Sequence, residues 1–395
     1  WEQRELGELA TKIGSGKTPR GGSSVYTQSG IPLLRSQNIY DDKVSFEDVA
    51  FINDSTDEDM ANSRVNRGDV LLNITGASIG RSAVYELSAT ANVNQHVCII
   101  RPSSNVHSYF IQLNLASSEG QKQIELNQAG GGREGLNFQQ IAKMSFYYPS
   151  LEEQIKLGVF FQQLNKTIAL HQRKLTLLKQ LKQTYLQALF PQSELNIPTL
   201  RFARFSDSWE HRKVSSLAKE TFGGGTPKTG VKKYWKGSFP WIQSSDLTTN
   251  QLHNVQPTKF ITEEAIKQSA THNVPGNSIA IVTRVGVGKL ALMRSSYSTS
   301  QDFLSLSNLN VDAVFGVYCL YKMLQREVNN IQGTSIKGIT KADLLGKCVS
   351  VPTKVEEQVK IGAFFKKIDD TIDFHESKLK HILELKKAFL EKMFL

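Results

Sequence analysis

The chain carries one sequence pattern twice. Residues 1–4 read WEQR and residues 209–212 read WEHR, and the Thr-Pro pair at Thr18 returns at Thr226, a shift of 208 positions (226 against 18). A period this long indicates a duplicated domain, because solenoid repeats are about 20 to 50 residues long. Two similar domains on one chain can adopt an approximate two-fold relation. Such a relation suits a partner that is itself two-fold or bipartite, as duplex DNA is.

Composition and charge limit the class of protein. The 395 residues are 39% hydrophobic and 21% charged, which is typical of a soluble globular protein of two or three domains. The longest apolar runs are only long enough for β-strands, so neither a signal peptide nor a membrane span is expected. The formal net charge of +10 favours an anionic partner, and in the absence of a lipid-anchor signature it favours nucleic acid over a membrane.

The three cysteines, Cys98, Cys319 and Cys348, occupy unrelated positions in the two copies. They lack the spacing of a metal site and are too few to cross-link a chain of this size. We interpret them as buried, inert thiols of a cytoplasmic protein, and we expect no metal site.

Each copy consists of a mixed region followed by one long helix. The predicted order is a mixed domain at 1–150, a helix at 151–190, a linker at 191–208, a second mixed domain at 209–351 and a second helix at 352–395. The β-like runs in the mixed domains are 31–34, 70–74, 97–100, 146–148, 241–242, 278–282, 303–306 and 348–351. Both domains are predicted to be α/β or α+β with partly antiparallel sheets, and the strand order is not readable from the sequence. Residues 200–205 precede Trp209, and we expect the natural chain to have further residues before Trp1.

The two long helices each carry one apolar stripe, and the stripes match after a shift of 204 positions (368 against 164). A helix of about 35 to 40 residues extends about 50 to 60 Å, and a stripe of that length needs another helix to cover it. The duplicate helix is the nearest candidate. The predicted helix-helix seam consists of Leu164, Ile168, Leu175, Leu178, Leu181, Tyr185, Leu189, Ile368, Ile372, Leu379, Ile382, Leu385, Phe389 and Met393.

The motifs that suggest catalysis do not meet their requirements. Residues 14–18 (GSGKT) look like the end of a P-loop, but Thr11 stands where that motif needs its first glycine and Pro19 follows where a helix must start. Neither the Asn-Pro-Pro-aromatic tetrad of amino-group DNA methyltransferases nor a Gly-x-Ser-x-Gly elbow occurs. We therefore expect no active site. The glycine turns are better interpreted as places where backbone amides and Lys17 or Lys228 approach a phosphate.

Polar segments that differ between the copies are candidates for reading DNA bases. Residues 31–38 (IPLLRSQN) match residues 239–246 (FPWIQSSD), so the polar tail changes from Arg, Ser and Asn to Gln, Ser and Asp. Arg pairs with guanine, Asn or Gln with adenine, and Asp accepts a hydrogen bond from cytosine. This difference predicts two readers with different preferences.

Two further pairs of segments place a cation beside glycine-rich backbone, which suits close approach to phosphate. They are residues 73–81 with 281–289, and residues 130–137 with 333–340. The candidate DNA-binding residues are Lys17, Arg20, Arg35, Ser36, Asn38, Thr75, Arg81, Arg133 and Asn137 in the first copy, and Lys228, Lys232, Lys233, Gln243, Ser244, Asp246, Arg284, Lys289 and Lys337 in the second.

The chain resembles the specificity subunits of type I DNA restriction-modification systems. The resemblance is carried by the repeated Trp-Glu segments, the Gly-x-Thr-Pro turns, the Thr-Gly and Gly-Arg or Gly-Lys segments, and a Pro-x-x-x-Glu-Glu-Gln segment at 352–358. The last of these returns with one residue fewer at 149–154, and in both copies it opens the long helix. The resemblance covers essentially the whole chain.

The resemblance implies two target-recognition domains, each reading one half of a bipartite, asymmetric site on double-stranded DNA. It implies that the two long helices form an antiparallel coiled coil that spaces the domains and docks two modification subunits. These subunits would bring S-adenosylmethionine and adenine methylation, while restriction subunits would bring ATP, Mg²⁺ and DNA cleavage. The chain itself would be non-catalytic, would hold no cofactor and would not bind a membrane.

Two other classes of function stay open. A stand-alone nucleotide-binding or nuclease enzyme would methylate or cleave DNA without added subunits. A protein-binding scaffold with incidental basic charge would bind DNA without a steep dependence on salt.

Overall fold

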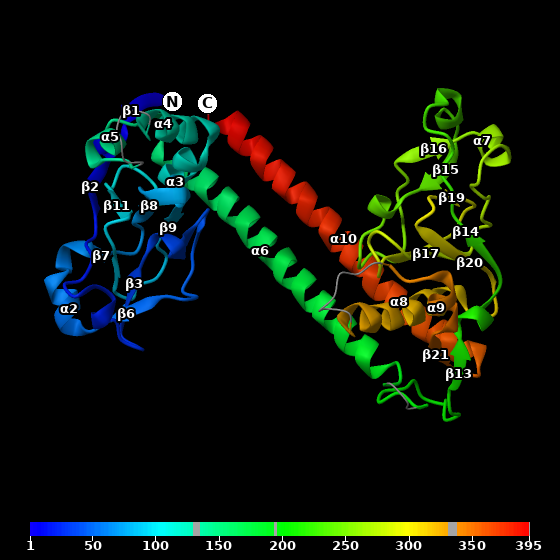
Figure 1. Cartoon of the computed structure of the whole chain (residues 1–395). Helices are drawn as coiled ribbons and strands as arrows, with labels where there is room; N and C mark the ends of the chain where they lie inside the picture. The colour runs from blue at the N-terminus through cyan, green and yellow to red at the C-terminus, as the bar shows by residue number, and fades with distance from the viewer. Residues whose placement is uncertain (129–134, 193–195, 331–337, 395) are drawn as a thin grey trace. The chain divides into compact units, whose positions relative to one another are not determined.

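The computed structural model describes residues 1–128, 135–192, 196–330 and 338–394. The chain divides into two compact units, one made of Trp1–Arg173 with Ser377–Leu395 and the other of Lys174–Glu376. Both ends of the chain therefore belong to the first unit (Figure 1). The compact units differ from the predicted domains, because each unit contains one mixed domain, the first half of one long helix and the second half of the other.

The first unit is built from short strands and helices that precede the long helix α6. Its strands are β1 (Glu2–Glu5), β2 (Ala10–Ser15), β3 (Ile31–Leu34), β4 (Ile39–Tyr40), β5 (Lys43–Val44), β6 (Ala50–Ile52), β7 (Arg64–Val65), β8 (Val70–Asn73), β9 (Ser82–Val84), β10 (Ala91–Val93), β11 (Val97–Pro102) and β12 (Ser145–Tyr148). Its helices are α1 (Leu6–Leu9), α2 (Asp54–Asp59), α3 (Ser108–Ala116), α4 (Ser118–Gln128) and α5 (Phe138–Ala142), followed by α6 (Leu151–Ala188).

The second unit repeats this plan and ends in the long helix α10. Its strands are β13 (Glu210–Lys213), β14 (Ala218–Gly223), β15 (Phe239–Ile242), β16 (Lys259–Ile261), β17 (Ser278–Val282), β18 (Leu290–Met293), β19 (Ser298–Thr299), β20 (Phe303–Leu309) and β21 (Cys348–Val351). Its helices are α7 (Glu263–Lys267), α8 (Ala313–Asn330), α9 (Lys341–Gly346) and α10 (Val355–Met393).

The two units share one sheet topology. The sheet β2-β11-β8-β9 of the first unit matches β14-β20-β17-β18 of the second, β6-β3-β10 matches β16-β15-β19, and the pair β1-β12 matches β13-β21. The pairs β3-β10 and β15-β19 are parallel, whereas the pairs within the two four-stranded sheets named above are antiparallel. The predicted mixed α+β class with partly antiparallel sheets is confirmed.

The central strands are buried on both faces, which explains their continuous apolar runs. Side chains alternate across a strand. Accordingly, Leu72 and Ile100 belong to the core that includes α3 and the helix ends, whereas Leu71 and Ile99 belong to the core on the other face. In the second unit the whole of β17 is buried in the same way.

The long helices run antiparallel within each unit. In the first unit the start of α6 contacts the end of α10, with the rings of Phe160 and Phe389 5.3 Å apart. In the second unit the end of α6 contacts the start of α10, with the rings of Tyr185 and Phe364 4.9 Å apart. This arrangement lets each stripe be covered by the other helix.

An aromatic residue just beyond each long helix completes the core of a unit. Phe394 follows α10 and lies 5.3 Å from Phe110 between ring centroids. Phe190 follows α6 and lies 5.6 Å from Phe315, the counterpart of Phe110. The sequence periodicity stops at the helix ends, so it did not identify either aromatic residue.

The predicted seam is correct in part. Five of its members, Ile168, Leu175, Leu189, Ile368 and Ile372, are buried. Leu181 and Leu385, however, are 42% and 37% exposed, and Lys182 beside Leu181 is only 5% exposed. The prediction for these two leucines is wrong, because at this turn of each helix the lysine points inward to a buried carboxylate.

Candidate nucleic-acid interface

The predicted base-reading segments follow β3 and β15 and fold as the same turn. In the first unit the side-chain oxygen of Asn38 accepts a hydrogen bond from the backbone N–H of Arg35 at 3.0 Å. In the second, Asp246 accepts from the N–H of Gln243 at 2.9 Å. A short polar residue at the end of the turn therefore closes it in both units.

This turn corrects the prediction for one residue, Asn38, and gives Asp246 a structural role as well. Asn38 is 1% exposed, and its amide also donates to the carbonyl oxygens of Ser45 and Glu47. The second carboxylate oxygen of Asp246 accepts from the hydroxyl of Thr258 at 2.6 Å. Because Asn38 is buried and its polar atoms are used inside the loop, it is a structural cap and presents no free edge to a base. Asp246 caps the matching turn but is only half-buried, so its prediction as a base contact stays a prediction.

The residues that open the turn have a different character. Arg35 is half-buried and donates through Nη2 to the carbonyl of Asp48 at 3.0 Å, while its Nε is buried, so only its terminal Nη atoms are placed to reach a base. Gln243 is half-buried and accepts from Lys259 Nζ at 3.1 Å. Arg35 and Gln243 thus retain hydrogen-bonding capacity, which keeps them as candidate readers.

The second predicted segment lies against the first in each unit. The carbonyl of Ser36 accepts from the amide of Asn73 at 2.9 Å, and the carbonyl of the matching Ser244 accepts from Lys289 Nζ at 3.0 Å. The structure therefore brings the two predicted segments together. Arg81 lies on the same side of the first unit, with its guanidinium 6.0 Å from the ring centroid of the exposed Tyr40.

The Thr-Pro turns bring in residues that the sequence analysis missed. The hydroxyl of Thr226 donates to the side-chain oxygen of Gln301 at 2.7 Å, and Thr18 makes the same hydrogen bond to Gln95. The signal was present, since Gln95 and Gln301 are 206 positions apart, between the two shifts that relate the copies. Lys17, by contrast, uses its Nζ to bind the carbonyl of Asp59.

The third predicted segment is described only in part, because Arg133 and Lys337 lie outside the described residues. Asn137 accepts from the backbone N–H of Gln140 at 2.8 Å and caps α5, while the residue is exposed, so it has a structural role and its DNA contact stays a prediction. The matching Thr340 caps α9 through the N–H of Asp343.

The segment before each cap pairs with the threonine turn of the second predicted segment. The backbone N–H of Leu136 donates to Ile74 at 2.9 Å, and that of Ile339 donates to Thr283 at 2.7 Å. Thr283 also uses its hydroxyl to bind the carbonyl of Asp302, whereas Thr75 shares a hydrogen bond with His96 at 2.6 Å. Both predicted threonines therefore hold the loops together.

A cavity of about 440 Å³ in the second unit joins these parts. Gln301, Thr283, Arg284 and Lys341 line it together with Gly223 at the end of β14 and Gly224 after it. Two cations beside an exposed amide suit a phosphate next to a base edge. The predicted cations that are exposed are Lys17, Arg20, Arg81, Lys228, Lys232, Lys233 and Arg284.

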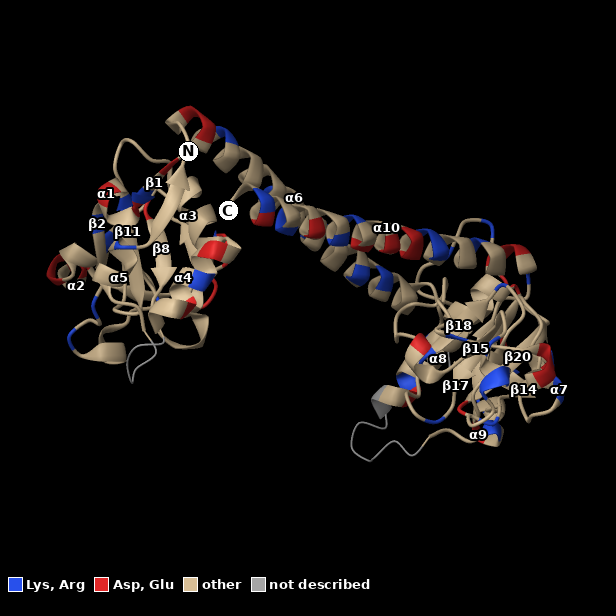
Figure 2. Cartoon of the chain, turned by 90° about the horizontal axis from the view of Figure 1, so that it is seen from above, with Lys and Arg blue, Asp and Glu red and all other residues tan. Residues whose placement is uncertain are grey.

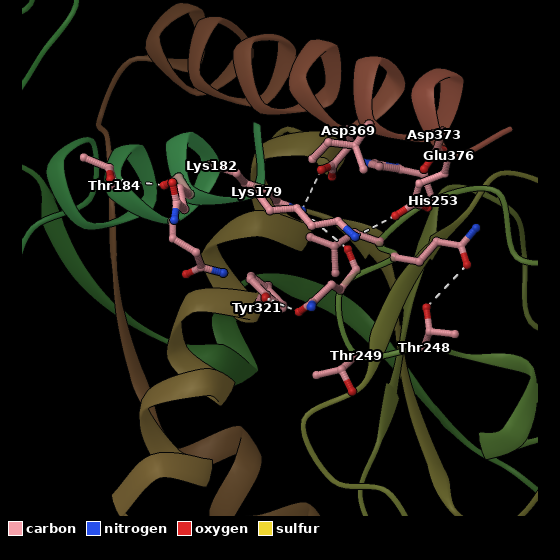
Figure 3. A pocket seen from close by; sticks show the side chains of 16 residues that line it. Lys179, Lys182, Thr184, Thr248, Thr249, His253, Tyr321, Asp369, Asp373 and Glu376 are labelled. Carbon is pink, nitrogen blue, oxygen red and sulfur yellow. Dashed lines mark hydrogen bonds and ion pairs between the residues drawn. The ribbon is translucent and has the colours of Figure 1, made fainter. Parts of the chain in front are cut away.

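A larger cleft, of about 1120 Å³, lies in the second unit where residues 248–253 meet both long helices (Figure 3). Its centre is an ion pair between Lys182 Nζ and Asp369 Oδ1 at 2.6 Å, with 6% and 11% of the two side chains exposed. The hydroxyl of Tyr318 donates to the other oxygen of Asp369 at 2.7 Å. Burial raises the pKa of Asp369, although Lys182 acts in the opposite direction.

The other charged side chains of this cleft also have partners, and carboxylates outnumber ammonium groups. Lys179 pairs with Glu376 at 2.7 Å, and Asp373 accepts from Asn254 at 3.3 Å. His253 lies 3.1 Å from the hydroxyl of Tyr318, and burial lowers its pKa to about 4. Three carboxylates face two ammonium groups, so this cleft does not attract a polyanion. It is a structural junction between the domain and the helices.

The two long helices differ in their charge. Along α10, Lys side chains are mixed with Asp and Glu (Figure 2), whereas α6 has acidic residues only in its first turn, Glu152 and Glu153, and carries Lys and Arg beyond it. The mixed charge of α10 lacks the single-sign field that concentrates nucleic acid. The predicted DNA-binding residues all belong to the mixed domains.

Other classes of site find no support among the described residues. They contain no group of three or more His, Cys, Asp or Glu side chains placed to hold a metal ion. No helix within them is both long enough and apolar enough to cross a membrane. Burial raises the pKa of both Cys98 and Cys319 to about 12, in agreement with inert thiols, whereas Cys348 is exposed, contrary to prediction.

Comparisons with known proteins agree with this organisation. The family model of the type I restriction modification DNA specificity domain matches residues 1–180 and again residues 206–384. The type I restriction enzyme MjaIX specificity subunit of Methanocaldococcus jannaschii is 30% identical over 182 residues, which are 45% of this chain and 41% of that protein. The putative type I restriction enzyme MjaX specificity subunit of the same organism is 23% identical over 99% of this chain and 92% of that protein.

A solved structure shows the same fold. The S subunit of a type I restriction-modification system from M. genitalium superposes with a TM-score of 0.68 at 12% identity, covering 100% of this chain and 96% of that one. At this identity the likeness concerns the fold, including the two mixed domains and the two long helices.

Proposed function

The chain belongs to the type I restriction modification DNA specificity family, and from this premise we propose that it is the DNA-specificity subunit of a type I restriction-modification complex. Each mixed domain reads one half of a bipartite site. The observation that carries the proposal is that one topology occurs twice with different side chains at the same turn, Arg35 in one unit and Gln243 in the other. Two domains of the same fold with different base-contacting side chains are what recognition of an asymmetric bipartite site requires.

The reading chemistry follows from the residues that remain accessible. The guanidinium of Arg35 matches the two acceptors of guanine, and the amide of Gln243 matches adenine. The exposed cations around them supply sequence-independent affinity through phosphate contacts. Base preference and salt-dependent affinity are thus assigned to different side chains.

The outer faces of the long helices support the docking of partner subunits. Leu170, Leu177 and Leu181 are 65%, 55% and 42% exposed, and their spacing of seven and four places them on one face of α6. Of the matching positions of α10, Phe374 and Leu385 are 55% and 37% exposed, and the position that matches Leu177 is His381. Apolar rows at matched positions of two helices suit two copies of one partner, and we assign them to the modification subunits.

The catalytic functions are assigned to those partners. Modification subunits would bring S-adenosylmethionine, and restriction subunits would bring ATP and Mg²⁺. This chain contributes recognition and spacing and needs no cofactor of its own.

Selection from a library of random DNA duplexes tests the proposal. The full chain is expected to enrich a motif of two short defined halves separated by an undefined spacer, with binding that weakens steeply as salt rises. Enrichment of one continuous motif, or binding without sequence preference, would contradict it. Methylation or cleavage of DNA by the purified chain alone would favour a stand-alone enzyme instead.

A further inference from the structure

An exposed glutamine occupies the same place in both units. Gln95 lies between β10 and β11, and Gln301 lies between β19 and β20, which are the corresponding strands. Both side chains are exposed, although the strands that follow are largely buried. The turn that carries each glutamine joins the sheet that contains β10 or β19 to the four-stranded sheet that contains β11 or β20.

A threonine hydroxyl holds each glutamine in place. Thr226 donates to Gln301 Oε1 at 2.7 Å, and Thr18 donates to Gln95 Oε1. Both threonines belong to the turn that follows the edge strand, β14 or β2. A carboxamide has two N–H donors and two acceptor lone pairs, so one hydrogen bond orients it and leaves the rest of its capacity.

Close packing of backbone brings each turn to its glutamine. A Cβ atom on Gly16 would lie 1.7 Å from the carbonyl oxygen of Val93, and one on Gly224 would lie 1.7 Å from that of Ser300. Only glycine permits this approach. In both units a glycine of the turn therefore packs against the backbone at the end of the strand before the glutamine, β10 or β19.

The surroundings of the two glutamines differ. The amide nitrogen of Gln95 lies 3.1 Å from His96 Nε2, whereas Gln301 lines the cavity that contains Arg284 and Lys341. The pair of threonine and glutamine is thus retained while its neighbours change. The opposite holds at Arg35 and Gln243. There the turn is the same in both units, but the side chain proposed to contact a base differs.

We propose that Gln95 and Gln301 are specificity-determining residues that read an A·T pair at the corresponding position of the two half-sites. A glutamine amide pairs with N6 and N7 of adenine in the major groove, and its hydroxyl partner fixes the orientation of the amide before DNA arrives. The proposal rests on the proposed function and adds which base the two halves have in common.

Selection on random duplexes by the full chain and its variants tests this inference. The wild type should enrich adenine at an equivalent position of each half-site. Gln95→Ala should lose that preference, about 5- to 150-fold, in one half only, and Gln301→Ala should lose it in the other half. Gln95→Glu and Gln301→Glu should shift the preference at the same position toward cytosine, whose amino group donates to a carboxylate.

Matched variants distinguish reading from a structural role. Thr226→Val should weaken the preference at the position read by Gln301, and Gln187→Ala, at an exposed site on α6, should change nothing. If Gln95→Ala and Gln301→Ala lowered binding to every sequence equally, or left the selected motif unchanged, the inference would be wrong while the proposed function stood. A wild type that selects no two-part motif would refute the proposed function itself.

Discussion

The two units hold their mixed domains against the long helices with the same lysine but with carboxylates from different elements. In the second unit Lys182 of α6 pairs with Asp369 of α10. In the first, Lys386 of α10 pairs with Asp42 of the mixed domain. The positions that match these acids hold neutral residues, Asn250 for Asp42 and Asn165 for Asp369 (shifts of 208 and 204).

Both units therefore pair this lysine with a carboxylate, but the carboxylate belongs to the other helix in the second unit and to the mixed domain in the first. The helices of the second unit supply the acid for their own lysine, so the second domain needs no carboxylate there. In the first unit the domain must supply the acid, and the amide of Gln112 also binds Asp42, at 2.6 Å. A domain exchanged into the first unit therefore needs a carboxylate at the position of Asp42.

Removing the lysine should affect the second unit more than the first. Lys182→Met leaves Asp369 buried without its cation, and breaking a buried pair in this way costs about 3 to 5 kcal/mol. Lys386→Met should cost less, because 18% of the Lys386 side chain is exposed, against 6% of the Lys182 side chain. Urea unfolding, followed by hydrogen exchange in each unit, measures the loss of unfolding free energy in the two variants. An equal loss from the two variants would contradict the comparison.

Replacing the first tryptophan of each copy should likewise destabilise the second unit more than the first. Trp209 is 2% exposed and lies against Phe190 and Phe315, whereas Trp1 is 52% exposed. Trp209→Ala should therefore destabilise the second unit by about 3 to 5 kcal/mol, the usual cost for a buried tryptophan. Trp1→Ala should cost about 1 kcal/mol or less. Unfolding midpoints of the two variants give the comparison, and a larger loss from Trp1→Ala would overturn it.

Moving the carboxylate from the mixed domain to the helix tests whether either element can supply the partner of the lysine. Asp42→Asn alone removes the carboxylate that pairs with Lys386, and we expect a loss of about 1 to 3 kcal/mol in the first unit. Adding Asn165→Asp places an acid where the second unit has Asp369 and should recover most of that loss. Unfolding of the single and double variants forms a mutant cycle. If the effects of the two substitutions on the free energy of unfolding simply added, an acid at position 165 would not replace the acid at position 42.

Acid should weaken the second unit through His253. Burial lowers the pKa of this imidazole to about 4, below the value of about 6.5 in an unfolded chain. The unfolded state therefore binds the extra proton first, so this contribution to stability is present above about pH 6.5 and is lost as the pH falls toward 4. The matching residue of the first unit is Ser45.

His253→Ser should consequently reduce the pH dependence of the second unit between pH 6.5 and 4.5. Urea midpoints across this range measure the effect, with the first unit as an internal reference. An unchanged pH profile would show that His253 is not the group responsible.

The strands and helices were predicted from the sequence better than the contacts between side chains were. The strands and both long helices follow from hydrophobic periodicity, because that pattern reflects burial along one element. Lys182 was not recognised as buried, since its burial depends on Asp369, which is remote in sequence. Asn38 was assigned to a base because polar loop residues look alike until their hydrogen bonds are known.

The candidate site shows the same limit. Gln95 and Gln301 were missed although both copies contain them, because they lie outside the glycine-rich segments and only folding brings them to Thr18 and Thr226. Strand order was likewise unreadable, since the pairing of β10 with β3 and of β19 with β15 joins distant segments.

The most direct test of the central claim exchanges the first mixed domain. Residues 1–150 are replaced by those of another family member that carries an acid at the position of Asp42, and the DNA motif is selected again. We predict that one half of the motif changes, while the other half and the spacer stay as they were. A change in both halves, or in neither, would contradict the assignment of one reader to each unit.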